Sequence, residues 1–181
     1  MIFDCHIHTK HFSTDAKMTI DECLNALKCN NISGIITEHI DYDYPDPAQY
    51  VFDPNEYFTE FIKYRSDTLA HLDYISRYSH YDDPYIHYSD YHRYIDEILN
   101  YIISNDKAIE INTRLFDDEK AVNTIDEIMS VYSKMGGKYI TFGSDAHIAS
   151  NIGMNFKKAS NIAQRYNLHP VYFENRNMQY A

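Results

Sequence analysis

Histidine side chains close the first apolar run of the sequence in a pattern that suits metal binding. His6 and His8 are separated by one residue. Alternate residues of a strand point to the same side, so both imidazoles can face one ion. A single His-x-His pair is common on protein surfaces, and its meaning here depends on what accompanies it.

Further histidines and acidic residues follow other apolar runs of the chain. Taken singly, Asp15 or His71 could equally be a helix-capping aspartate or a hydrogen-bonded core histidine. Taken together, imidazoles and carboxylates from separate segments indicate a site for Zn, Mn or Fe. These further candidates are Asp15, Glu38-His39, His71 and Asp145-Ala146-His147.

The elements that must position these residues are predicted to be β/α units. Short apolar runs alternate with amphipathic stretches, as in a parallel sheet or barrel. The carboxyl ends of parallel strands meet at one edge, where active sites assemble, and the candidates stand at such ends. The predicted strands lie near residues 2–6, 33–37, 68–72, 108–112, 138–142 and 170–174.

Helices are predicted from their caps and from apolar spacing. Thr19 and Glu22 have the spacing of a capping box, which opens a helix that reaches about Cys29. A helix over about 118–135 should stop at Gly136-Gly137 in a left-handed cap. Other helices are expected after Asp53-Pro54, over about 90–104 and after Gly153.

Residues 74–94 are dense in Tyr, His and Asp. They are either a polar loop that leads into the next helix or a segment that overhangs the site and contacts substrate.

Composition narrows the class of protein. The chain has 181 residues and a net charge of -11, so we expect residues 1–181 to form a single domain whose surface repels nucleic acid and anionic membranes. An acidic protein that binds a phosphorylated small molecule needs local cations, either basic side chains or metal ions. The three cysteines lack the spacings of paired motifs, and no leader-like or membrane-spanning apolar run is present, so a cytoplasmic enzyme with reduced thiols is expected.

The chain resembles the PHP family of metal-dependent phosphoesterases, and within it the histidinol-phosphatases. The resemblance lies in several stretches that run from the N-terminus to the last helix in the family's order. They are Asp4–Thr9, Phe12–Met18, Ile36–His39, Ala70–Ile75 with Arg77-Tyr78, Ile109–Thr113 and Gly143–His147.

The resemblance implies an α/β fold, a distorted TIM-like (β/α)7 barrel with up to three divalent ions at its strand ends. Asp145, His147 and His39 would be the catalytic residues. The implied ligands are His6, His8 and Asp145 for the first metal, His71 for the second, and Asp15, His39 and His147 for the third.

A middle segment of the family is missing from this chain. Between Tyr64 and His71 the family has further β/α elements with a bridging glutamate and a second-metal histidine, and only residues 65–70 stand here. A βαβ unit needs about 30 residues. We therefore expect an incomplete barrel of about six strands, a second metal left with His71 alone, fewer than three ions, and open edges that could join another subunit. Possible substitutes for the glutamate are Glu38, Asp67 and Glu110.

The resemblance implies a phosphatase that converts L-histidinol phosphate to L-histidinol and phosphate in histidine biosynthesis. Arg77 and Arg114 are candidates for binding the phosphate, because guanidinium matches phosphate oxygens in pairs, although either could form a surface ion pair instead. Two alternatives remain: a PHP phosphoesterase for another small phosphorylated metabolite, and a truncated, non-catalytic metal-binding domain.

Overall fold

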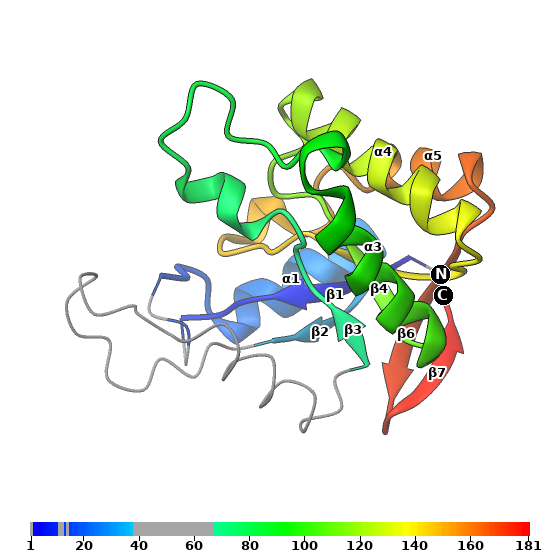
Figure 1. Cartoon of the computed structure of the whole chain (residues 1–181). Helices are drawn as coiled ribbons and strands as arrows, with labels where there is room; N and C mark the ends of the chain where they lie inside the picture. Colours follow the sequence, from blue (N-terminus) through cyan, green and yellow to red (C-terminus); the bar gives the residue numbers. More distant parts are fainter. Residues whose placement is uncertain (1, 11–12, 14, 38–66) are drawn as a thin grey trace.

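Parallel strands with helices packed against them form the part of the chain that the computed structural model describes, residues 2–10, 13, 15–37 and 67–181 (Figure 1). β1 and β2 pair with each other, and the remaining strands follow one another in sequence order. All neighbours are parallel except the last pair. The strands are β1 (Phe3–Ile7), β2 (Ser33–Ile36), β3 (Thr68–Leu69), β4 (Ala108–Asn112), β5 (Tyr139–Gly143), β6 (His169–Glu174) and β7 (Asn177–Tyr180).

The two sheets are joined where β1 passes the end of β5. A parallel bridge links Ile7 with Ala146, and the backbone N–H of Asp145 donates to the His6 carbonyl over 2.8 Å. The N–H of His8 donates in turn to the Ala146 carbonyl over 3.0 Å. The carboxyl ends of β1 and β5 therefore lie side by side.

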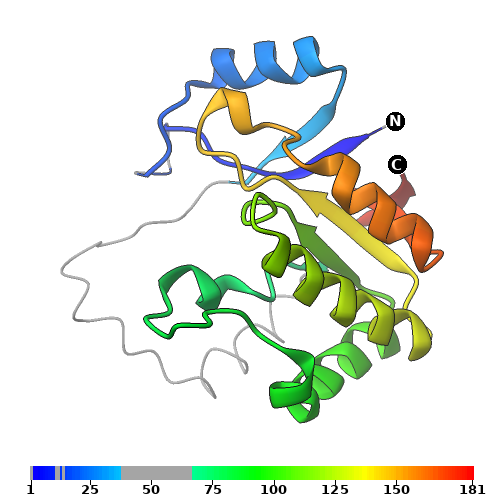
Figure 2. The ribbon, with the colours of Figure 1, turned by 90° about the horizontal axis from the view of Figure 1, so that it is seen from above.

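The helices cover the strands and bury the main core. Figure 2 shows α1 beside β1 and β2, with α5, α4 and α3 following along the other strands. Leu99, Ile128 and Ile162 of these helices pack with Ile111 and Ile140 of β4 and β5. The helices are α1 (Ile20–Asn30), α3 (Tyr88–Ser104), α4 (Glu119–Lys134) and α5 (Phe156–Arg165).

The caps expected from the sequence are present. The Thr19 hydroxyl accepts from the N–H of Glu22 over 3.1 Å, and the Glu22 carboxylate accepts from the N–H of Thr19 over 2.7 Å. Gly136 follows α4 with a φ of 98°, as a left-handed cap requires. None of the helices in the described ranges is long and apolar enough to cross a membrane.

The two sheets have open edges among the described residues. There, β2 pairs only with β1, β3 pairs only with β4, and β7 pairs only with β6. The predicted α/β class and the incomplete barrel are thus confirmed.

Two strand predictions were wrong in detail. The strand expected over 68–72 ends at Leu69, because His71 has a φ of 27° and cannot continue an extended strand. β7 was missed, so the described residues form seven strands rather than about six. Its turn has positive φ at Asn175 and Arg176, as in a type I′ hairpin, but arginine gives little signal for such a turn.

Other predictions concern segments around the site. The helix expected after Asp53-Pro54 lies outside the described residues. The polar region 74–94 begins as the 3-10 helix η2 (Tyr74–Tyr78), continues without regular structure, and enters α3.

Candidate metal centre

Asp145 is the point at which the predicted ligands meet. It follows β5 in the left-handed conformation, with a φ of 52°, which aspartate tolerates better than most residues. Its Oδ1 lies 3.3 Å from Nε2 of His8 and 3.9 Å from Nε2 of His6. The alternation of β1 thus places both imidazoles beside one carboxylate oxygen.

His147 joins this cluster from the same loop. Its Nδ1 donates to the Asp145 carbonyl over 2.8 Å, and its Nε2 lies 2.9 Å from Oδ2 of Asp15. The rings of His8 and His147 have centroids 4.6 Å apart. The pairing of Asp15 with His147 is what the third metal site would require, while His39 lies outside the described residues.

Within the described ranges, the candidate ligand atoms form two groups that share Asp145. One group contains His6, His71 and Asp145, the other His8, Asp145 and His147, and the ligand atoms of each group lie within 4.8 Å of one another. Two atoms that bind one ion at about 2.0–2.2 Å are at most about 4.4 Å apart. The distances from His6 and His8 to Asp145 already meet this limit, so the donor set fits a divalent ion with small adjustments.

This grouping differs from the one implied by the resemblance. His71 was expected to be the sole remaining ligand of the second metal, but the structure places it with His6 and Asp145. Burial lowers the pKa of His71 to about 4, so its imidazole is neutral and able to bind metal at physiological pH. The assignment of each residue to a particular ion stays a prediction.

Two arginines balance the charge of Asp145. Nη1 of Arg77 lies 2.6 Å from Oδ2, and Nη1 of Arg114 lies 3.2 Å from Oδ1. The Arg77 side chain is 9% exposed, whereas that of Arg114 is 38% exposed. Burial raises the pKa of Asp145, but the hydrogen bond from His8 and the nearby positive charges outweigh burial and hold this pKa well below its usual range. Neither arginine is a simple surface ion pair.

β4 supplies two further residues to the centre. Glu110 was predicted only as a possible substitute for the family's bridging glutamate, and Asn112 was given no role. Glu110 accepts from Nδ1 of His6 over 2.7 Å, and Asn112 accepts from Nη2 of Arg77 over 3.2 Å. Burial by itself raises the pKa of Glu110, but His6 lowers it below its ordinary value. For His6, burial lowers the pKa, and Glu110 raises it above its ordinary value by a larger amount. The available signal was the spacing of Glu110 and Asn112 on one strand face, at the edge where the other candidates gather.

Asp4 is another buried polar residue, and its role was not predicted from the sequence. Its carboxylate accepts from the backbone N–H groups of His6 over 3.2 Å, Ser144 over 3.0 Å and Gly153 over 3.1 Å. It therefore ties β1 to the loop that carries Asp145. The signal was a charged residue within an apolar strand, which needs partners when it is buried.

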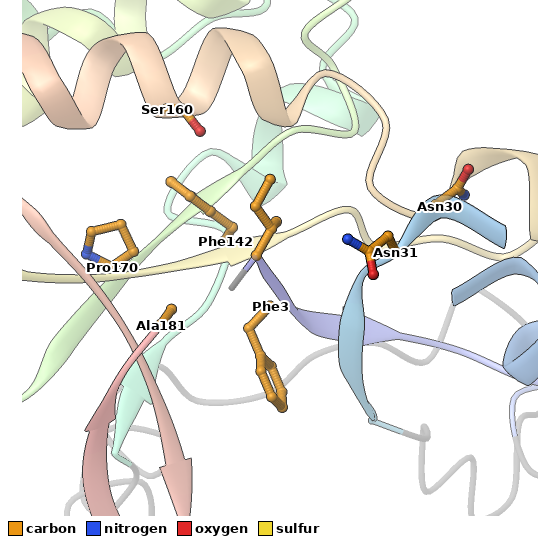
Figure 3. Close-up of a pocket in the computed structure, with 8 residues that line it drawn as sticks. Phe3, Asn30, Asn31, Phe142, Ser160, Pro170 and Ala181 are labelled. Atoms are coloured by element: carbon orange, nitrogen blue, oxygen red, sulfur yellow. The ribbon is translucent and has the colours of Figure 1, made fainter. Parts of the chain in front are cut away.

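A hollow of about 600 Å³ lies elsewhere, against the start of β1 (Figure 3). None of its lining side chains is titratable and none is a predicted ligand, so it does not offer the chemistry of the histidine cluster. The lining residues are Ile2, Phe3, Asn30, Asn31, Phe142, Ser160, Pro170 and Ala181.

Relatives of one kind are found among known proteins. No family model matches the chain. A probable histidinol-phosphatase from Clostridium acetobutylicum is 35% identical over 256 residues, covering 100% of both chains. A histidinol-phosphatase from Lactococcus lactis is 36% identical over 105 residues, covering 58% of this chain and 39% of the relative.

One solved structure has the same fold. It is a histidinol phosphate phosphatase from Lactococcus lactis complexed with zinc, L-histidinol and phosphate, with a TM-score of 0.81, 21% identity and 98% of each chain covered. Since this chain has 181 residues, at least 75 of the 256 positions aligned with the Clostridium relative have no counterpart in it. This shortfall agrees with the expected absence of an internal segment.

Proposed function

The chain belongs to the histidinol-phosphatase branch of the PHP phosphoesterases, and we propose that it hydrolyses L-histidinol phosphate to L-histidinol and inorganic phosphate. The observation that carries the proposal is the sharing of Asp145 by two groups of histidines. A carboxylate between two ion sites suits a reaction in which two neighbouring ions act on one phosphoryl group.

The residues that would hold one or two ions are His6, His8, His71, His147 and Asp145. Bound divalent ions would supply a nucleophile from water near neutral pH and offset the charge on the phosphoryl oxygens. Imidazole and carboxylate ligands suit Zn, Mn or Fe. Zinc is the first ion to test, because the Lactococcus structure was solved with zinc.

The arginines would bind the anionic substrate in a protein whose overall charge is -11. Arg114 is the better candidate for the phosphate, because its side chain is 38% exposed and can turn from Asp145 to a phosphoryl oxygen. Arg77 is held by both Asp145 and Asn112 and is nearly buried. We propose that Arg77 chiefly fixes the orientation of Asp145 and adds positive charge.

The proposal is tested by measuring metal content and phosphate release on the full chain. The purified protein is loaded with Zn or Mn, its metal is counted by elemental analysis, and phosphate release is followed with L-histidinol phosphate and a panel of other monoesters. Preference for L-histidinol phosphate supports the proposal. Equal or better turnover of another small phosphorylated metabolite would contradict the substrate assignment.

A second candidate function is favoured by the positions that this chain lacks relative to its Clostridium relative. It is a metal-binding domain without catalysis, since the family's bridging glutamate has no counterpart in sequence. Stoichiometric metal with no phosphate release from any monoester would support it. Release that disappears in Asp145→Asn would exclude it.

We further propose that residues 1–181 act as one domain in the cytoplasm. The open edges at β2 and β3 suggest pairing with a second copy, which light scattering during size-exclusion chromatography would detect.

A further inference from the structure

Glu110 is a buried carboxylate whose two oxygens each serve a different part of the candidate metal centre. It lies in the middle of β4 and is 4% exposed. Oε1 accepts from the ring N–H of His6 over 2.7 Å, and Oε2 accepts from the backbone N–H of His71 over 2.7 Å. The Asn112 side chain donates to the same Oε2 over 3.1 Å. Burying a charged carboxylate costs free energy unless hydrogen bonds compensate, so Glu110 needs these bonds, and they restrict its position.

The contact with His6 selects one form of the imidazole. A carboxylate only accepts hydrogen bonds, so Nδ1 of His6 carries the proton. The lone pair is then on Nε2, the atom that lies 3.9 Å from Oδ1 of Asp145. Histidines that bind metal commonly donate their other ring N–H to a carboxylate, which fixes the ring and makes it a better ligand.

The contact with His71 acts on the backbone. His71 has a φ of 27°, a conformation that is costly for a residue with a side chain. The hydrogen bond from its N–H to Glu110 helps to hold this conformation just beyond the end of β3. His71 and His6 then have ring centroids 5.1 Å apart, close enough to share an ion.

Gly143 provides the room for this arrangement. A methyl group at this position would overlap the Glu110 carboxylate and the Cβ of His6. The glycine of β5 therefore permits the close approach of Glu110 to His6, and a larger residue here would disturb both side chains without removing the carboxylate.

We propose that Glu110 is a positioning residue that orients His6 and His71 toward a shared divalent ion without binding the ion itself. This inference rests on the proposed metal-dependent function and deepens it.

The test uses Glu110→Gln, which keeps the size of the side chain and removes its charge. Zn or Mn affinity is measured by calorimetry on the full chain, with phosphate release measured in parallel. We expect the affinity to fall about 10–100-fold, as for other outer-shell partners of metal-bound histidine. Saturating metal should restore the number of bound ions and much of the activity. Asp126→Asn, the same change at a surface ion pair with Arg165, should bind metal as the unmodified chain does.

Three outcomes would overturn the proposal. Unchanged affinity in Glu110→Gln means that no positioning occurs. A lost ion that saturating metal does not restore means that Glu110 is a direct ligand. If the unmodified chain binds no divalent ion, the proposed function is refuted as well. If the unmodified chain binds metal and only the Glu110→Gln result differs from the expectation, the proposed function still stands.

A spectroscopic measurement keeps the proposal testable if Glu110→Gln does not fold. Long-range ¹H–¹⁵N spectra of the zinc-loaded, unmodified chain should show His6 protonated at Nδ1 and metal-bound at Nε2. The opposite pattern would refute the assignment. Gly143→Ala is a second variant. Its methyl group would displace both the Glu110 carboxylate and His6, so metal binding should weaken although the charge of Glu110 is kept, and unchanged affinity would contradict the proposal.

Discussion

Replacing Asp145 by asparagine removes a negative charge near which three imidazoles and two guanidinium groups converge, while it keeps the size of the side chain. The side chains of Asp145 and Arg77 are 2% and 9% exposed, so the variant leaves a nearly buried arginine without its charged partner. Breaking a buried ion pair costs about 3–5 kcal/mol. Asparagine can still accept a hydrogen bond from Arg77, so we expect the lower end, about 3 kcal/mol.

This loss should appear as a lower melting temperature. For a chain of this length each kcal/mol corresponds to about 2–4 °C, so Asp145→Asn should melt about 6–12 °C below the unmodified protein. The comparison is made with chelator present, because bound metal would add its own stabilisation. With metal added, affinity should fall more than the 10–100-fold expected for an outer-shell partner, and phosphate release should fall to background.

The stability that Asp145 contributes depends on pH. The pKa of Asp145 in the folded protein lies below its value in the unfolded chain. The stabilisation from Asp145 is therefore complete above the pKa that the group has in the unfolded chain, about 3.9. It is lost as the pH falls through the lower pKa that the group has in the folded protein. The titration of Asp145 itself should therefore shrink the melting difference only in strong acid, and any change near neutral pH should come from His6, whose pKa Asp145 helps to raise.

The control for this experiment is Asp126→Asn. Its partner Arg165 is 58% exposed, and the hydrogen bond that Asp126 accepts from the Tyr166 hydroxyl can be kept by the asparagine oxygen. Surface ion pairs contribute little, so this variant should melt and bind metal like the unmodified chain. If Asp145→Asn behaves in the same way as the control, Asp145 is not the centre of the site and the reasoning is wrong.

Three further predictions concern the pH dependence of metal binding, thiol reactivity and helix capping. Burial lowers the pKa of His6, but Glu110 raises it by a larger amount, so the pKa lies above its ordinary value and this imidazole must lose a proton to bind metal. Metal affinity should therefore fall as the pH drops below neutral. Calorimetry in buffers of different ionisation enthalpy should detect the released proton, and a binding heat that does not depend on the buffer would contradict this prediction. Cys5 is half-buried, and desolvation raises the pKa of its thiol to about 12, whereas Cys29 is exposed. Mass spectrometry after brief alkylation at pH 8 should therefore find Cys29 modified and Cys5 largely intact, and equal modification of both would contradict the raised pKa of Cys5. Thr19→Ala removes the capping box of α1 and should lower the free energy of unfolding by about 1 kcal/mol, or the melting temperature by about 2–4 °C. Thr19→Ser keeps the cap and should lose less. Equal melting temperatures of the two variants would show that the cap contributes nothing.

Local signals in the sequence were sufficient for several elements. The Thr19 and Glu22 pair predicted where α1 begins, because a capping box depends on residues three apart in one turn. The apolar run over 108–112 is β4 residue for residue, since a strand buried along its whole length is apolar apart from the residues it presents to a site. β7 and the early end of β3 were not predictable in this way, because they depend on backbone angles at Arg176 and His71 that residue type does not encode.

The sequence by itself determined which chemistry is present: imidazoles and carboxylates at the ends of predicted strands, in an acidic chain that resembles a metal-dependent phosphoesterase. Only the tertiary structure decided how they combine. The bonding of β1 to the loop after β5 places His6 and His8 beside Asp145, and Glu110 then joins His6 to His71 across three strands. These contacts link residues that are distant in sequence, and their geometry depends on strand order and register, which no local pattern of residues specifies.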